Sequence, residues 1–136
     1  MKKLLSLLAV FVLAFNFTSC SNDDDKPKTM QQKLIGKWEY YRHIHPDDSE
    51  SHEIGNECAT KREFLEIKKN NNSTYGYYNS DCELSSWDYT YTFDNTTNII
   101  SFVGEYNWSE KVLEVTSNTL KLDDGDGYYY ELRKAN

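Results

Sequence analysis

A long apolar run is missing from this 136-residue sequence. The longest apolar stretch, Leu4–Phe17, has about 14 residues, whereas a helix that crosses a bilayer needs about 20. Lys2 and Lys3 come just before it. A positive start followed by a short apolar stretch is typical of a secretory signal peptide. We therefore expect residues 1–19 to be a signal peptide and expect no permanent transmembrane helix.

Positive charge is also scarce. The chain has 15 Lys and Arg residues against 22 Asp and Glu residues, a formal net charge of −7 at pH 7. Removal of residues 1–19 takes away two lysines and brings this charge to −9. Nucleic acids and anionic lipid surfaces attract basic patches. We therefore do not expect this acidic domain to bind nucleic acid or to adsorb to anionic lipid.

Common catalytic motifs are absent as well. The sequence contains no Gly-x-Ser-x-Gly elbow, no phosphate-binding loop and no His-Glu-x-x-His motif. Carboxylates are plentiful, but the sequence alone does not place two of them across a cleft. We therefore expect a protein that is not an enzyme and needs no cofactor.

Two segments carry side chains that metal ions prefer. His43 and His45 lie two residues apart beside an acidic loop, so a zinc site is conceivable. The opposite face of this strand carries Trp38 and Tyr40, however, which places both histidines in solvent. The acidic segment Asp123–Gly127 lacks the spacing and final glutamate of a calcium loop and is better explained as a hairpin turn. We expect no metal site.

The first of the three cysteines follows the apolar stretch. Phe17–Cys20 resembles the lipobox of bacterial lipoproteins, in which a small residue precedes a lipidated cysteine. The resemblance implies lipidation at Cys20, whose several acyl chains would anchor the chain stably in a membrane. Ser21 and the acidic run after it resemble the tethers of lipoproteins sent to the outer membrane and displayed on the cell surface. We expect residues 20–28 to be a solvated acidic tether; the alternative is an ordinary signal peptide with an incidental cysteine.

The other two cysteines, Cys58 and Cys82, form an even pair in a chain expected to be secreted. An oxidising compartment favours their pairing as a disulfide. The bridge would contribute roughly 3 to 4 kcal/mol in the chain-entropy model. The alternative is two free thiols, or a nucleophilic thiol at Cys58.

Short strands account for the rest of the chain. Thr29–Gln32 has the form of a capping box, which predicts a short helix that ends near Gly36. Alternation is clearest in residues 86–94, where four aromatic residues alternate with polar ones. The expected strands are 37–45, 62–69, 73–79, 86–94, 99–104, 110–116, 119–123 and 128–134.

These strands are joined mostly by hairpin-length turns. Parallel sheets need crossovers of a dozen or more residues and are therefore excluded. We predict an all-β fold for residues 29–136, an eight-stranded antiparallel up-and-down barrel with a short N-terminal helix, because closure leaves no exposed edge. A two-sheet sandwich is the alternative.

The two ends of the strand region resemble lipocalins. Gly36, Lys37 and Trp38 open the first strand after a short helix, and Arg133 lies in the last strand. The likeness is to the small lipocalin-like domains of bacterial outer-membrane lipoproteins. It implies that Trp38 lies at the closed base of the barrel with Arg133 packed across it, a cation–π arrangement. We expect the domain to be a monomer.

Aromatic residues are abundant, with eleven Tyr, six Phe and three Trp. Facing inward, they would form apolar walls with polar tips, and Arg42 would add a charge suited to a ligand with an acidic head. Together with the resemblance, they predict a protein that binds or carries a small apolar or amphipathic molecule. The expected ligand-binding residues are Tyr40, Arg42, Trp87, Tyr89, Tyr91 and Tyr130. Alternatively, these rings simply fill the barrel, whose interior is only just wide enough for side chains.

A second hypothesis uses the outside of the barrel. Tyr75, Tyr77, Trp108 and Tyr129 are expected to point outward, where aromatic side chains can stack on sugars or anchor a protein. The chain would then bind a glycan or a partner protein through its exterior, with the interior filled. A contiguous outer patch of Tyr and Trp would favour this hypothesis.

Overall fold

The computed structural model describes residues 28–45 and 51–136. The expected signal peptide, the lipidation site Cys20 and nearly all of the acidic tether lie outside the described residues. Within the described part of the chain, one helix, α1 (Met30–Leu34), precedes nine strands. The strands are β1 (Gly36–Ile44), β2 (Ser51–Glu53), β3 (Phe64–Ile67), β4 (Asn72–Tyr78), β5 (Leu84–Asp94), β6 (Ile99–Val103), β7 (Trp108–Val115), β8 (Thr119–Asp123) and β9 (Tyr129–Lys134).

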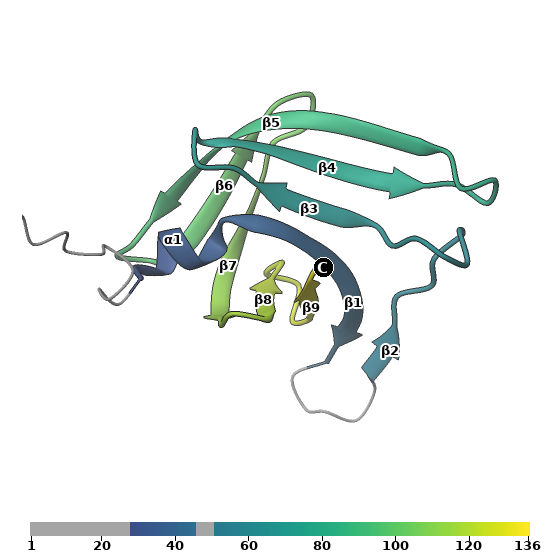
Figure 1. Ribbon diagram of the computed structural model, residues 1–136. Helices are drawn as coiled ribbons and strands as arrows, with labels where there is room; N and C mark the ends of the chain where they lie inside the picture. The colour runs from purple at the N-terminus through teal and green to yellow at the C-terminus, as the bar shows by residue number, and fades with distance from the viewer. Residues whose placement is uncertain (1–27, 46–50) are drawn as a thin grey trace, which may run out of the picture.

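The sheet closes into a barrel (Figure 1). Strands β3 to β9 follow one another as antiparallel neighbours, β3 also pairs with β1, and β1 pairs with β9. The prediction of an eight-stranded antiparallel up-and-down barrel is confirmed, and the closing pair rules out the two-sheet sandwich. All eight expected strands are present, with ends that differ by a few residues.

Strand β2 is an addition that the sequence did not predict. It pairs with Arg42–Ile44, the last residues of β1, whereas β3 pairs only with residues 36–39 of that strand. All three residues of β2 are exposed, so no alternation of buried and exposed positions reveals it. The outer half of β1 is thus flanked by β2 and by the connection to β3.

The helix and the first strand are joined through Trp38. Thr29 forms the predicted capping box with Gln32, and the helix ends at Ile35, which is extended. The indole N–H of Trp38 donates a 2.7 Å hydrogen bond to the carbonyl of Leu34, the last helical residue. Both side chains are fully buried. This contact holds α1 against the end of the barrel where β1 begins.

The cation over Trp38 is Lys134 and not Arg133, so the predicted partner is wrong. Lys134 Nζ lies 4.0 Å from the indole centroid and donates a 2.7 Å hydrogen bond to the carbonyl of Ile35. Side chains alternate along β9, so Arg133 points to the other face. There its guanidinium lies 3.3 Å from the ring centroid of Tyr41, with half of its side chain exposed.

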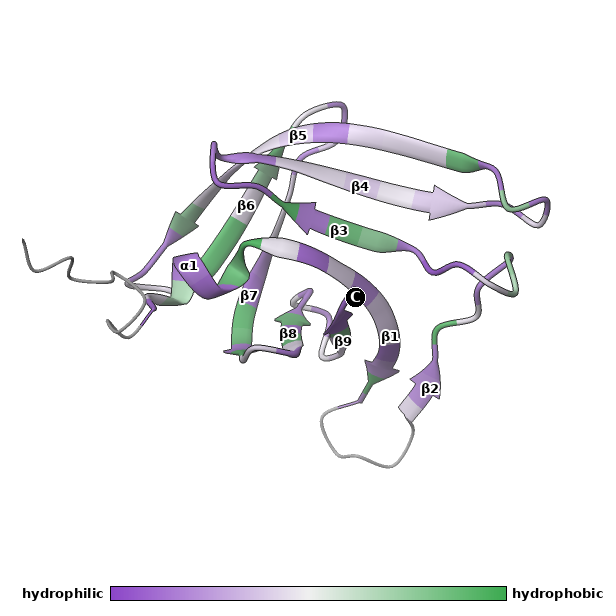
Figure 2. Ribbon diagram, in the orientation of Figure 1, coloured by the Kyte–Doolittle hydropathy of each residue, from purple (hydrophilic) through white to green (hydrophobic). Residues whose placement is uncertain are grey.

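The barrel is filled at the end next to α1. Apolar side chains from six strands and the helix pack there around Trp38. Figure 2 shows hydrophobic residues along β3, β6 and β7 near α1, and hydrophilic residues along β2 and the adjoining end of β1. The fully buried members of this core are Leu34, Trp38, Leu65, Ile67, Ile100, Phe102, Val112, Leu120, Leu122 and Leu132.

A bulge changes which side of β1 faces inward. The pairing of β1 with β9 shifts register between Tyr40 and Arg42. A bulge adds one residue and inverts the alternation beyond it. Tyr40 is buried in the core, whereas Arg42 lies outside, with its guanidinium 4.9 Å from the Tyr41 ring centroid. The predicted inward position of Arg42 is therefore wrong, and so is the predicted solvent position of His43, which lines the interior.

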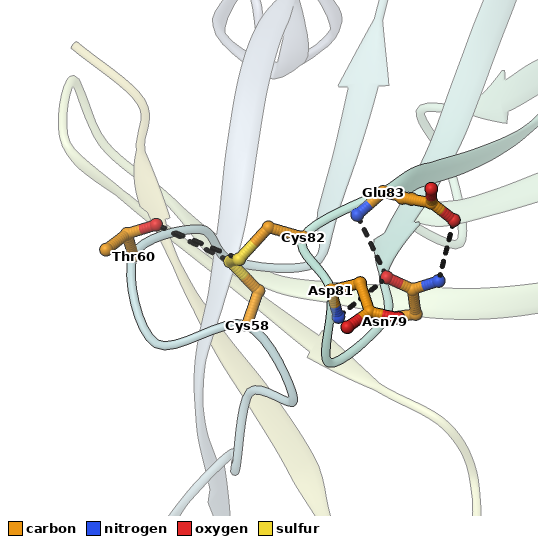
Figure 3. The surroundings of a disulfide bond; sticks show 6 residues. All are labelled: Cys58, Thr60, Asn79, Asp81, Cys82 and Glu83. Atoms are coloured by element: carbon orange, nitrogen blue, oxygen red, sulfur yellow. Dashed lines mark hydrogen bonds between the residues drawn. A yellow bond between two sulfur atoms is a disulfide. The ribbon is translucent and has the colours of Figure 1, made fainter.

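Cys58 and Cys82 form the predicted disulfide, with their Cα atoms 4.9 Å apart (Figure 3). The bond joins the connection between β2 and β3 to the turn between β4 and β5. That turn is ordered by Asn79, whose side-chain oxygen accepts hydrogen bonds from the N–H groups of Asp81 (3.1 Å) and Glu83 (2.9 Å). The disulfide therefore fixes an otherwise irregular segment to the barrel wall.

Candidate ligand cavity

The end of the barrel opposite α1 contains a cavity of about 640 Å³. Strands β1, β4, β5, β7 and β9 supply its inner wall, and β2 with the connection before β3 supplies one side. Its rim includes Tyr106, which is 67% exposed, together with the exposed His52 and Glu53. The complete lining is Tyr40, His43, His52, Glu53, Ile54, Glu63, Tyr75, Tyr89, Tyr106, Trp108, Glu110 and Tyr130.

Aromatic rings in mutual contact form most of the wall. Trp108 meets Tyr89 edge-on, with centroids 4.6 Å apart, and Tyr40 meets Tyr130 in the same way at 5.6 Å. Such edge-to-face pairs are a favourable aromatic geometry. Tyr75 lies edge-on to Tyr40 at 6.4 Å. These contacts hold the wall in one arrangement, so the cavity is largely preformed.

Tyr89 reaches its place over a glycine. A side chain at Gly104 would collide with the ring of Tyr89, which is only 6% exposed. Gly104 belongs to the turn between β6 and β7, and its lack of a Cβ lets the ring pack against the backbone. Gly104 thus shapes the cavity although it does not line it.

Three of the six residues predicted to bind a ligand line the cavity, namely Tyr40, Tyr89 and Tyr130. Tyr91 faces inward as expected but lies in the filled half, where its hydroxyl donates a 3.0 Å hydrogen bond to the carbonyl of Lys68. Trp87 packs at the edge of the core with its ring centroid 5.8 Å from that of Tyr75. Arg42 lies outside because of the bulge.

The proposed outer aromatic patch does not form as predicted. Tyr75 and Trp108 line the cavity instead of the exterior. The remaining two members, Tyr77 on β4 and Tyr129 on β9, belong to strands that are not neighbours in the barrel. The observation that would have favoured binding through the exterior is therefore missing for these four residues.

Several cavity residues were not predicted. Glu110 follows Trp108 by two residues and precedes Val112 by two, so an alternation beginning at Trp108 would have placed it inside. The prediction began this strand at Glu110 and missed the signal. Glu63 lies in the expected strand 62–69 and precedes Leu65 by two residues, so the same alternation would have placed it inside. No comparable pattern marks Ile54, which lies in the irregular connection before β3.

Glu110 is a buried carboxyl on the cavity wall. It is 7% exposed, and its Oε2 atom has no hydrogen-bond partner among the described residues. Burial raises its pKa to about 7; a polar contact from Trp108 lowers the value in part, and the charge of Asp124 raises it further. A buried carboxylate with one oxygen left without a partner is costly. Near neutral pH, Glu110 is therefore poised between its neutral and charged forms.

A second carboxyl shares the cavity. The hydroxyl of Tyr75 donates a 2.5 Å hydrogen bond to Glu63 Oε1. Burial raises the pKa of Glu63, and the bond from Tyr75 partly offsets this. Burial also raises the pKa values of Tyr40 and Tyr130, and the charges of Glu63 and Glu110 raise both further. The charges of the two carboxyls therefore affect the same two tyrosines, Tyr40 and Tyr130.

His43 adds a nitrogen base to the wall. Its ring stacks on Tyr130 with a centroid distance of 4.7 Å and an interplanar angle of 17°. Its Nε2 atom is buried and has no hydrogen-bond partner within residues 28–45 and 51–136. Cations gather on the outer face instead, where Arg42, Arg62 and Arg133 all lie over the ring of Tyr41.

The segment Asp123–Gly127 forms the predicted turn. The N–H groups of Gly125 and Asp126 donate to the side chains of Asp123 (2.8 Å) and Asp124 (3.0 Å), and both glycines have positive φ. Among the described residues, no three metal-ligating side chains gather into one cluster. None of the described helices has the length and apolar character needed to cross a membrane.

The fold and the cavity together define a small closed antiparallel barrel with one filled end and one hollow end. A family model described as a lipocalin-like domain matches residues 15–122, so the chain belongs to the lipocalin-like domain family. A comparison with curated proteins finds no match.

Two solved structures have the same fold. A lipocalin-like protein from Bacteroides uniformis ATCC 8492 matches with a TM-score of 0.61 and 18% identity over 76% of this chain and 99% of that chain. An uncharacterized protein from Bacteroides eggerthii DSM 20697 matches with a TM-score of 0.57 and 16% identity over 75% and 99%, respectively. At these identities the likeness concerns the fold alone.

Proposed function

We propose that the chain is a lipid-anchored lipocalin-like protein that binds or carries a small apolar or amphipathic molecule at the outer membrane or cell surface. The observation that carries the proposal is the aromatic cavity. Its volume of about 640 Å³ falls within the roughly 300–1,000 Å³ typical of small-molecule sites. Its polar groups, which include Glu63, Glu110 and His43, lie among aromatic walls, and small-molecule sites combine such walls with polar groups that orient the ligand.

The anchoring part of the proposal comes from the sequence. The lipobox-like segment Phe17–Cys20 supports lipidation at Cys20, and the acidic run after it supports display on the outer membrane. We propose binding without catalysis and without a cofactor. In this proposal the membrane is a partner through the lipid, and the barrel acts as a monomer.

Titration with N-phenyl-1-naphthylamine, an apolar dye that brightens in apolar sites, tests the binding function. The protein is the chain from Ser21 to Asn136 with its disulfide intact, since the barrel and its core lie within this range. We expect saturable binding with one dye per barrel. Tyr130→Ala should weaken it at least fivefold, because one wall of the cavity is lost.

Tyr129→Ala provides the matched control. Tyr129 is the neighbour of Tyr130 in β9, is also partly exposed, and does not line the cavity. We expect unchanged dye affinity for this variant. The absence of saturable binding, or equal losses in the two variants, would contradict binding inside the cavity.

A further inference from the structure

The charges around the cavity favour one class of ligand. We propose that the cavity selects amphipathic molecules with a positively charged amine group, held by the carboxyls of Glu63 and Glu110 within the aromatic wall. This inference rests on the proposed function and specifies its ligand. It replaces the acidic head group that the expected inward position of Arg42 suggested.

The first argument is the oxygen atom of Glu110 that has no partner in the described part of the chain. Glu110 is more than nine-tenths buried and lines the cavity, and its Oε2 atom has no partner in the described part of the chain. An ammonium group placed beside this atom would supply the hydrogen bond and the opposite charge that it lacks. An unsatisfied group facing a preformed cavity thus points to a ligand that completes it.

The second argument is the sign of the charge. Three glutamates, Glu53, Glu63 and Glu110, line the cavity, whereas none of the described lysines or arginines does. The nearby arginines lie outside, over Tyr41. An anionic ligand would therefore meet carboxylates without a compensating cation, which low-dielectric surroundings penalise strongly.

The third argument is the wall itself. The rings of Tyr40, Tyr75, Tyr89, Trp108 and Tyr130 surround the carboxyls. The faces of such rings attract cations, and desolvated cation–π contacts are stronger than exposed ones. Rings and carboxyls together therefore favour a cation attached to an apolar body over a neutral molecule of the same shape.

Three compounds with the same body test the selection: 4-phenylbutylamine, 4-phenylbutan-1-ol and 4-phenylbutyrate. Their affinities are measured at pH 8 by displacement of N-phenyl-1-naphthylamine. We expect the amine to bind at least tenfold more tightly than the alcohol, and the carboxylate to bind less tightly than the alcohol. Equal affinities of amine and alcohol would overturn the inference and leave the proposed function standing. Failure of the dye and of all three compounds would overturn both.

Glu110→Gln separates charge from shape. We expect this variant to lose most of the preference for the amine while its affinity for the alcohol stays within twofold, which also shows that the cavity is intact. Glu63→Gln should have a smaller effect in the same direction, because Glu63 already accepts a bond from Tyr75. Glu114→Gln is the control, since Glu114 is on the same strand but pairs outside with Lys121 at 2.8 Å. An undiminished amine preference in both Glu110→Gln and Glu63→Gln would overturn the inference.

The pH dependence gives an independent readout. A bound ammonium favours the charged form of Glu110, so amine binding below pH 7 must displace a proton from it. We expect the amine affinity to rise between pH 5.5 and 8, the alcohol affinity to stay flat, and the rise to shrink in Glu110→Gln. The titratable groups around Glu110 are Tyr40 of β1, Tyr130 of β9 and Asp124 of the turn before β9, with Glu63 and His43 also on the wall. A rise of equal size in Glu110→Gln would assign the dependence to these other groups and contradict the role of Glu110.

Discussion

At the residue scale, the side chain of Lys134 explains why a glycine precedes Trp38 by two residues, because it crosses this segment. Gly36 has a φ of +138°, and a Cβ there would collide with Lys134 Nζ. The missing side chain lets Lys134 reach the carbonyl of Ile35 and the face of Trp38 at once. A lysine reaches into this narrow space as a compact ammonium on a flexible stem, whereas a guanidinium is broad and planar. The glycine, the tryptophan and the lysine therefore act as one unit.

Substitution of Lys134 tests this unit. Lys134→Ala removes a partly buried cation–π contact and a hydrogen bond to the backbone, so we expect it to lower the free energy of unfolding by about 2 kcal/mol. Arg133→Ala should cost less than about 1 kcal/mol, because its side chain is 52% exposed. Urea unfolding followed by tryptophan fluorescence measures both. A larger loss for Arg133→Ala would restore Arg133 as the cation that matters.

At the element scale, the regular strands could be predicted and the irregular ones could not. In β5 the alternation is unbroken, so Tyr89 and Tyr91 face inward as the sequence indicated. In β1 the extra residue after Tyr40 reverses the alternation, and nothing in the residue types marks a bulge that is fixed by pairing with β9. Because of this one added residue, His43 lines the cavity and Arg42 does not.

The same limit explains why Glu63 and Glu110 were not predicted to line the cavity. A glutamate in a strand is normally assigned to solvent, so the residue type does not mark Glu110, the first residue of the expected strand 110–116, as an inner residue. Glu63 comes from a connection whose path is set by β2 and by the disulfide, both of which depend on distant parts of the chain. Charge inside the cavity is therefore the property that sequence patterns predicted least well.

The disulfide is the element-scale constraint that can be tested directly. It closes a loop with a sequence separation of 24; the loop carries Glu63 of the cavity wall, and Ile54 of the wall lies just before Cys58. Replacing Cys58 and Cys82 with alanine should lower the free energy of unfolding by about 3 to 4 kcal/mol. It should also weaken the binding of N-phenyl-1-naphthylamine, because the connection before β3 loses its attachment. Urea unfolding and dye titration measure the two effects.

Reduction provides the control for this variant. Dithiothreitol should destabilise the unchanged protein by a similar amount and should leave the double-alanine variant unaffected. Thiol titration of the unfolded, unreduced chain from Ser21 should find no free thiol. Two free thiols, or destabilisation of the variant by dithiothreitol, would contradict the structural role of the bond.

At the scale of the whole molecule, the two ends of the barrel have different tasks. Helix α1 lies at the end of the barrel at which the described chain enters (Figure 1). Trp38 and Lys134 help to close this end, and the cavity opens at the other end. A tether that precedes α1 therefore joins the barrel at its filled end. Anchoring and ligand binding are thus expected to be separable properties of one chain.

Cys20→Ser tests that separation. In a Gram-negative host, the full chain should appear in the membrane fraction with a mass that includes acyl chains on Cys20, and the Cys20→Ser variant should appear in the soluble fraction. Its Tm and its affinity for N-phenyl-1-naphthylamine should equal those of the unchanged barrel, because every core and cavity residue lies beyond residue 28. The Cys58→Ala, Cys82→Ala variant should show the converse, with membrane association kept and Tm lowered. If Cys20→Ser stayed in the membrane fraction, the anchor would have to lie elsewhere in the chain, and the acidic segment after residue 20 would lose its role as a tether.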